Sequence, residues 1–230
     1  MKGAVIAVSG IDTGVGKTFV TGRLAAALIA EGRKVITQKI VQTGTAGIPE
    51  DIREHRRLMG SPLLDADREG LTCPYIFSYP SSPHLAARLE GREIDIMNIR
   101  RATFALQRQY EIVILEGAGG LMVPLTGELL FADYLRDAGY PLLLVTLPRL
   151  GSINHTLLSI EACMKRGIPL KAVIYNRFED PGEPISGETK EVIMRWLGRW
   201  GFSTPVIDLG ADGFDLRDLA AFFAQATLNP

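Results

Sequence analysis

The feature that most constrains the fold is a glycine-rich stretch that separates two apolar segments near the start of the chain. Residues 8–18 read VSGIDTGVGKT. Residues 4–8 are apolar and rich in β-branched side chains, and residues 19–30 place apolar side chains at helical spacing. A strand, a glycine-rich turn and a helix in this order form the context that a phosphate-binding loop requires.

This loop carries the groups that bind a phosphate chain. Glycines let the backbone turn so that its N–H groups point at an anion, and the positive end of the following helix adds to the attraction. Lys17 would reach the β- and γ-phosphates, and the Thr18 hydroxyl would hold Mg²⁺. We therefore expect ATP to contact the following residues: Asp12, Thr13, Gly14, Val15, Gly16, Lys17, Thr18 and Phe19.

The match to the common phosphate-loop pattern is incomplete. Ile11 occupies the position where the pattern has its first glycine, and Gly10 comes one residue earlier. The alternative is a glycine-rich turn that contains Gly-Lys-Thr by chance. Because strand, turn and helix fall in register, we favour the phosphate loop, and the Asp12-Thr13 pair indicates a subgroup of such loops.

The composition is that of a globular protein with one α/β domain. The chain has 230 residues, of which 47% are hydrophobic and 22% charged, and its net charge is −1. A single domain over residues 1–230 can therefore build a full core. No basic patch indicates nucleic-acid binding, and the apolar runs are of strand length, so we expect no membrane span.

The N-terminus and the cysteines predict a cytoplasmic protein. The chain runs directly into its first apolar segment, which leaves no room for a signal peptide. Cys73 and Cys163 are the only two cysteines, and their spacing fits no metal motif. We expect two unpaired thiols in a reducing compartment.

Apolar patterning predicts strands and helices that alternate along the chain. The predicted strands cover residues 4–8, 34–39, 111–115, 141–146, 170–175 and 206–209. The predicted helices cover residues 19–30, 49–59, 84–89, 96–109, 129–137, 152–165, 189–200 and 216–226. Residues 65–83 are expected to be irregular. This order predicts a doubly wound, mostly parallel sheet of about seven strands with helices on both faces, the arrangement of P-loop NTPases.

In such a sheet, ligands bind at the carboxyl ends of the strands. Several polar or glycine-rich segments that are far apart in the sequence fall at those ends: residues 10–18, 39–44, 116–120 and 147–154, and Asn176. Their convergence at one edge indicates a ligand site more strongly than any single motif does.

Three charged side chains near these ends have both a functional and a structural interpretation. Glu116 follows a buried strand, where nucleotide hydrolases place the acid that holds Mg²⁺, although a carboxylate can also simply end a strand. Asp51 begins a helix, and taken alone it favours a capping role over metal binding. Lys39 ends a strand within reach of the loop and could act on an anionic reacting centre, but most lysines are solvated.

Residues 149–154, which read RLGSIN, open another predicted helix. The free N–H groups of a helix start can bind a carboxylate or a phosphate, and the alternative is an ordinary N-cap by Ser152. His84 has no catalytic partner or metal-ligand spacing around it, so we expect a structural histidine there.

Five motifs, in chain order, resemble the dethiobiotin synthetase family. Residues 10–18 resemble its Gly-Thr-Asp-Thr-x-Val-Gly-Lys-Thr loop, and residues 39–44 (KIVQTG) its Lys-Pro-x-x-(Ser/Thr)-Gly. Residues 80–84 (PSSPH) resemble its Pro-x-Ser-Pro-His, and residues 116–124 its Glu-Gly-Ala-Gly-Gly-x-x-x-Pro. Residues 150–155 (LGSINH) resemble its Leu-Gly-x-Ile-Asn-His. The chain departs from the family at Ile11 and Ile40, where the usual residues are Thr and Pro.

The resemblance implies a reaction. ATP and CO₂ convert 7,8-diaminononanoate (7,8-diaminopelargonate) to dethiobiotin in biotin synthesis. One amine takes up CO₂, and the resulting carbamate attacks the γ-phosphate of ATP to give a carbamic–phosphoric anhydride. The second amine then closes the ureido ring and expels phosphate. Positioning and charge neutralisation would carry most of this catalysis.

The resemblance also implies three groups of site residues. The catalytic residues would be Lys39, Lys17 and Thr13. Mg²⁺ would be held by Thr18, Asp51 and Glu116, and ATP would also contact Glu116 and, at its adenine, Asn176. The substrate would contact Thr13, Lys39, Thr43, Gly119, Gly151, Ser152, Ile153 and Asn154. In the family the last segment comes from the other subunit, which implies a homodimer with shared sites.

Two related classes of P-loop protein are the alternatives. Amidotransferase-type ligases of cobalamin synthesis share the loop type but carry a glutaminase domain with a catalytic cysteine, and nothing here supplies one. Partitioning or metal-delivery ATPases work as nucleotide-gated dimer switches. They carry an extra lysine near the start of the loop, where this chain reads Ser9-Gly10-Ile11-Asp12.

Overall fold

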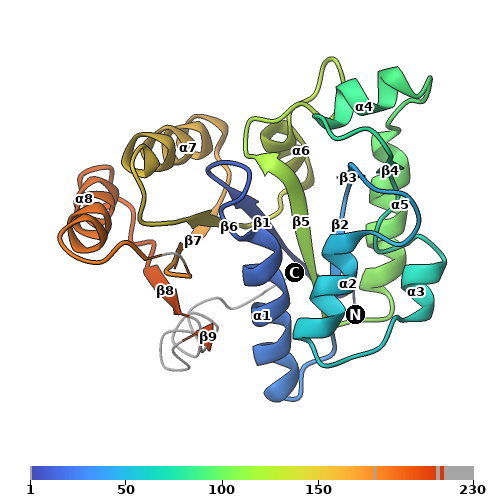
Figure 1. The fold of residues 1–230 in the computed structure, drawn as a ribbon, viewed down its shortest axis with the longest axis horizontal. Coiled ribbons are helices and arrows are strands. Elements are labelled where there is room, and N and C mark those ends of the chain that lie inside the picture. Colours follow the sequence, from blue (N-terminus) through green and yellow to red (C-terminus); the bar gives the residue numbers. More distant parts are fainter. Residues whose placement is uncertain (1, 179, 211–212, 215–230) are drawn as a thin grey trace.

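A seven-stranded sheet forms the centre of the molecule (Figure 1). The computed structural model describes residues 2–178, 180–210 and 213–214. Along the sheet the strand order is β2-β5-β1-β6-β7-β8-β9, and every pairing is parallel except that of β8 with β9. The strands are β1 (Ala4–Gly10), β2 (Val35–Lys39), β5 (Ile112–Gly120), β6 (Leu142–Thr146), β7 (Leu170–Asn176), β8 (Val206–Gly210) and β9 (Gly213–Phe214). The predicted sheet is confirmed.

Eight helices are present in the described part of the chain. They are α1 (Lys17–Ala30), α2 (Glu50–Leu58), α3 (Asp65–Arg68), α4 (Pro83–Leu89), α5 (Ile96–Gln107), α6 (Phe131–Ala138), α7 (Ser152–Arg166) and α8 (Ile185–Arg199). None of these helices is long and apolar enough to cross a membrane. A second, two-stranded sheet joins β3 (Gln42–Thr43) to β4 (Ile76–Phe77).

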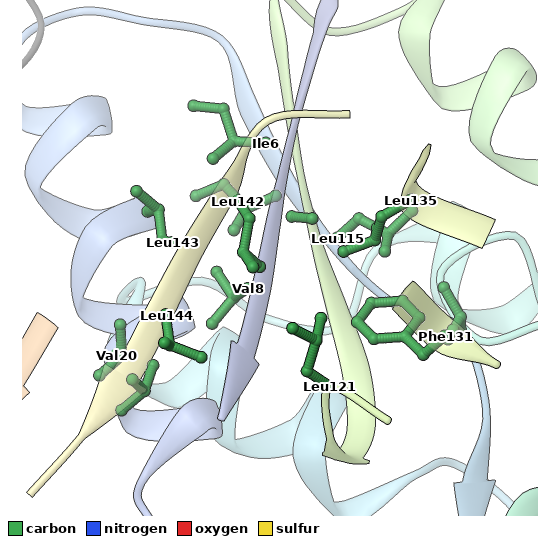
Figure 2. Close-up of a cluster of buried hydrophobic side chains, with 14 of the residues drawn as sticks. Ile6, Val8, Val20, Leu115, Leu121, Phe131, Leu135, Leu142, Leu143 and Leu144 are labelled. Atoms are coloured by element: carbon green, nitrogen blue, oxygen red, sulfur yellow. The ribbon is translucent and has the colours of Figure 1, made fainter. Parts of the chain in front are cut away.

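The order of the strands explains which face each helix covers. The connection from β1 through α1 leads to β2, towards one edge of the sheet, whereas β5 leads through α6 to β6, in the opposite direction. Because crossover connections are right-handed, α1 and α6 must lie on opposite faces. Figure 2 shows Val20 of α1 and Phe131 of α6 on the two sides of the central strands.

The core consists of apolar side chains from the central strands and from the helices on both sides. Val8, Leu115 and Leu144 are completely buried on three neighbouring strands (Figure 2). Strands that are covered on both faces read as continuous apolar runs, which is why β6, with the sequence LLLVT, was recognisable from sequence. This core fixes the strand ends on which the site is built.

The structure differs from the predicted elements in five places. Residues 65–83 were expected to be irregular but contain α3 and β4, and β5 continues to Gly120 instead of ending at Leu115. Helix α8 begins at Ile185, four residues before the prediction, and neither β3 nor β9 was predicted. The helix predicted at residues 216–226 lies outside the described residues.

Candidate active site

The phosphate loop joins β1 to α1 at the carboxyl edge of the sheet. Gly14 and Gly16 adopt positive φ angles of 73° and 86°, which L side chains avoid, and Gly16 is the N-cap of α1. The Lys17 ammonium is buried and donates to the Asp12 carbonyl oxygen at 2.9 Å. The loop therefore presents a helix N-terminus and a lysine to the same space, as an anion site requires.

The pKa of Lys17 is lowered to about 8, because burial disfavours the charged ammonium and the nearby Lys39 repels it. A polyphosphate ligand favours the charged form, so above this pKa binding must take up a proton. We expect the affinity for a non-hydrolysable ATP analogue to fall roughly tenfold per pH unit above that value. Isothermal titration in buffers of rising pH would measure this slope. Lys17→Arg, which stays charged, should lose it, and an equally steep slope in that variant would contradict the assignment to Lys17.

Beside the loop, the side chains of four residues form one cluster: Thr18, Lys39, Asp51 and Glu116. Lys39 ends β2 and pairs in register with Glu116 of β5, so the two side chains lie on the same face. The Lys39 ammonium lies 2.7 Å from Glu116 Oε1 and 2.7 Å from Asp51 Oδ2, and donates to the Gly117 carbonyl. The Thr18 hydroxyl donates to Glu116 Oε1 at 3.2 Å. The structure thus brings together residues predicted from four separate segments.

The electrostatics of this cluster keep Lys39 and Glu116 charged. Burial alone would raise the pKa of Glu116, but Lys39 and a hydrogen bond from His55 hold it well below its usual range. Burial would likewise lower the pKa of Lys39, yet Glu116 and Asp51 together raise it above its usual range. A charged lysine is therefore fixed next to the phosphate loop.

Three structural alternatives considered from the sequence are wrong. Lys39 is only 5% exposed, so it is not a solvated surface lysine. Helix α2 has Pro49 as its N-cap and no side-chain cap, so Asp51 does not cap it but lies in its first turn and pairs with Lys39. Glu116 does not end its strand either, because β5 continues through the glycines that follow.

The oxygen atoms around Lys39 suit a hard divalent cation. Thr18, Asp51 and Glu116 offer a hydroxyl and two carboxylates. Both carboxylates contact the Lys39 ammonium directly, and the Thr18 hydroxyl contacts Glu116. No group of three His, Cys, Asp or Glu side chains that could hold a metal alone exists among the described residues. This pattern fits Mg²⁺, which is usually held by one or two carboxylates together with substrate phosphates.

Sequence reasoning missed His55, which contacts Glu116 from α2. The His55 ring is completely buried, and its Nε2 lies 2.8 Å from Glu116 Oε2. Helix α2 appeared to be a charged surface helix, so this histidine was not considered. The available signal was its spacing, since His55 follows Asp51 by four residues and therefore shares its helix face.

A small cavity next to the loop is suited to a nucleobase. It has a volume of about 330 Å³ and is lined by Gly14, Gly16, Thr18, Phe19, Glu54, Leu147, Asn176 and Phe178. The rings of Phe19 and Phe178 lie 5.6 Å apart there. The Asn176 amide donates to the Val15 carbonyl and accepts from the Phe178 N–H, so it also braces the loop. Phe178 was not predicted from the sequence.

Three of the predicted substrate residues lie in different segments: Thr13 in the loop, Gly119 in β5 and Thr43 in β3. A Cβ on Gly119, whose φ is +67°, would lie 3.7 Å from the Thr13 hydroxyl, so these two residues are neighbours. Thr43 lies in β3 and pairs with Phe77 of β4. A Cβ on the following Gly44 would lie 3.1 Å from Pro80, which brings residues 39–44 next to the PSSPH segment. No partner was found for the buried Nδ1 of His84 among the described residues.

The segment at the start of α7 reaches the loop through one ion pair. Arg149 donates to Asp12 Oδ2 at 2.8 Å, although both side chains are nearly half exposed. Gly151 is the N-cap of α7, which has no side-chain cap, so the N-cap alternative for Ser152 is wrong. Gly151 and Asn154 are exposed, Ile153 is half-buried, and Leu150 is 91% exposed.

Comparison with known proteins identifies the family. Residues 4–202 match the family described as AAA domain. The chain is 62% identical, over all of its length and 95% of the relative's, to the ATP-dependent dethiobiotin synthetase BioD of Chlorobaculum tepidum. This chain belongs to the dethiobiotin synthetase family. A second family member, ATP-dependent dethiobiotin synthetase BioD 2 of Pasteurella multocida, is 46% identical over 89% of this chain and 97% of its own.

Solved structures support the fold that the dethiobiotin synthetase family shares with other P-loop proteins. The ParA family ATPase from Chlorobium tepidum TLS aligns with a TM-score of 0.55 over 98% of this chain and 91% of its own. Its sequence identity is only 15%, so the similarity concerns the fold alone.

Proposed function

We propose that the protein catalyses the ATP-dependent carboxylation and ring closure of 7,8-diaminononanoate with CO₂, giving dethiobiotin, ADP and phosphate. The observation that carries this proposal is the position of Lys39. A charged, buried lysine lies between Glu116 and Asp51, beside a loop that presents Lys17 and Thr18. A reaction in which a carbamate attacks a phosphate needs several cations around one anionic centre.

The residues of the site divide this work. Lys17 and the loop N–H groups would hold the phosphate chain, and Lys39 would draw the carbamate oxygen and the γ-phosphate together by neutralising both. Thr13 and the Gly119 backbone would position the diamine on the opposite side. Holding the amine, carbamate and phosphoryl group in line lowers the entropic part of the barrier.

Mg²⁺ is the metal ion that the oxygen donors suit, and Thr18, Asp51 and Glu116 would hold it. When bound, Mg²⁺ supplies positive charge to the β- and γ-phosphates. The remaining nucleotide contacts would come from Gly14, Val15, Gly16 and Phe19, with Asn176 at the adenine. Its amide keeps one N–H for this contact, because only one of the two donates to the loop.

We further infer a homodimer in which each subunit contributes to the other's site. The substrate carboxylate would be bound by Gly151, Ser152, Ile153 and Asn154 of the second subunit, and the exposed Leu150 beside them would be covered in the dimer. Sedimentation would test this, since a fully active monomer would rule out shared sites. The two buried free thiols and the use of ATP suit a cytoplasmic enzyme with one domain.

The decisive experiment measures phosphate release from ATP and Mg²⁺ with bicarbonate, in the presence and absence of the diamine. Release that depends on the diamine is expected, together with a product that is heavier by one carbonyl and lighter by two hydrogens in a mass spectrum. ATP hydrolysis at a rate that does not depend on the diamine, with no new product, would instead favour a nucleotide-gated dimer switch.

A further inference from the structure

The imidazole ring of His55 has one hydrogen-bond partner in the described part of the structure. Its ring is completely buried, and Nε2 contacts Glu116 Oε2 at 2.8 Å. Its other nitrogen, Nδ1, is buried and makes no hydrogen bond within the described residues. Burying an imidazole with one nitrogen unpaired is costly, so the contact with Glu116 must account for its presence.

The neighbouring buried residue of α2 has a different role. Arg56 donates two hydrogen bonds to Asp67, at 2.9 and 2.7 Å, and another to Thr37 at 2.9 Å. These contacts tie α2 to α3 and to the sheet, and none of them reaches Glu116. The buried face of α2 thus holds one side chain that anchors the helix and another that contacts the site.

The two oxygens of Glu116 have different partners. Oε1 accepts hydrogen bonds from Lys39 and from Thr18. Under the proposed function, Lys39 also binds the carbamate and the γ-phosphate, and Thr18 also binds the metal ion. Oε2 accepts from His55, which lies behind the site and touches no other predicted site residue by a hydrogen bond. A carboxylate only accepts, so His55 Nε2 carries the hydrogen.

We infer that His55 is a positioning residue that holds Oε2 of Glu116 and thereby keeps Oε1 turned towards Thr18, Lys39 and the metal–phosphate site. The inference deepens the proposed function and rests on it. Outer contacts of this kind orient carboxylates that serve a metal ion, and their loss typically costs about 10–100-fold in metal affinity or activity. Without His55 the Glu116 side chain could rotate whenever Lys39 or Thr18 turned to substrate.

The test compares three substitutions at one position. His55→Leu fills the space but has no hydrogen-bond donor. His55→Gln places an amide N–H near the position of the imidazole Nε2, whereas the shorter side chain of His55→Asn does not reach Glu116. Mn²⁺ binding to the complex with ADP, followed by electron paramagnetic resonance, gives a readout that is independent of turnover. We expect His55→Leu and His55→Asn to weaken Mn²⁺ binding about tenfold or more, and His55→Gln to restore most of it.

Asp67→Asn is the matched control, because it loosens the anchor of the same helix without touching Glu116. Thermal unfolding of every variant separates a loss of stability from a loss of metal binding. If His55→Leu fails to fold, the pair His55→Asn and His55→Gln still decides the question. In steady-state assays the Mg²⁺ concentration at half-maximal rate should rise in the Asn variant, with the KM for the diamine unchanged.

Wild-type Mn²⁺ affinity in His55→Asn, or an equal loss in Asp67→Asn, would overturn the inference. The catalysed reaction and the role of His55 are tested by different measurements. Wild-type protein without diamine-dependent phosphate release would remove the proposed function, while the comparison of Mn²⁺ binding among the variants would still decide whether His55 positions Glu116.

Discussion

Lys39→Ala is expected to lower kcat at least about 100-fold, the size of effect seen when one preorganised charge-stabilising group is removed from an active site. The ammonium lies 2.7 Å from both Glu116 and Asp51, and no other lysine has this position in the described structure. Single-turnover phosphate release with saturating ATP and diamine would measure the loss in the chemical step itself.

The Lys39→Ala variant should remain folded. Removing one partner of a buried ion pair can cost about 3–5 kcal/mol, but Glu116 keeps its hydrogen bonds from Thr18 and His55, which reduces the cost here. Lys171→Ala, at an exposed position of β7, is the control for the loss of a lysine. Near-normal turnover in Lys39→Ala would remove this residue from the mechanism.

Gly16→Ala is expected to abolish measurable nucleotide binding. Gly16 has a φ of +86°, and an added Cβ would overlap the Asn176 amide nitrogen, which itself braces the loop by donating to Val15. Strain and overlap thus act together, and relieving them would move the backbone N–H groups that face the phosphates. Titration with a fluorescent ATP analogue would measure the loss.

Gly14→Ala separates the two causes. Gly14 also has a positive φ, of +73°, but an added Cβ would meet nothing within 4 Å. This substitution should therefore carry only the backbone penalty of about 1–2 kcal/mol, or roughly a tenfold loss. Equal losses in the two variants would mean that strain, and not the contact with Asn176, limits the loop.

The fold was largely predictable from the sequence because the central strands are covered on both faces. Continuous apolar runs such as β6 are distinctive, and their alternation with helical patterns leaves few topologies. The parts that were missed lack such patterns. Strands of two residues, such as β3 and β9, have no periodicity, and the four-residue α3 is too short to show one.

The extent of β5 illustrates a second limit. Glycine is rare in strands, so the prediction ended at Leu115, yet the pairing of Gly10 with Gly120 carries the strand further. Tertiary contacts overrode the local preference at that point. Glycine is required at Gly117 of this stretch, because an added Cβ there would overlap the Phe131 ring, whereas a Cβ on Gly120 would meet the Gly10 carbonyl oxygen at an ordinary contact distance of 3.5 Å.

The residues that the structure brings together were recognisable where a charged residue type coincided with a motif, as at Lys17, Lys39 and Glu116. The burial of His55 and Arg56 was not predicted because charged and polar residues on a helix normally face solvent. Their burial depends on the position of α2 against the sheet, which no local pattern specifies. Helical spacing from Asp51 was the one local clue, and it becomes informative only once Asp51 is known to face inward.

The Lys39 ammonium between Glu116 and Asp51 also affects how the protein folds. Lys17 and Lys39 balance the two carboxylates from within the chain, so these buried charges need no bound ion to compensate them. Folding and the loading of the site are then separate events, unlike those of small domains that assemble around a metal ion. A chelator should accordingly leave the melting temperature unchanged, and a chain newly released from the ribosome could wait, folded, for its nucleotide.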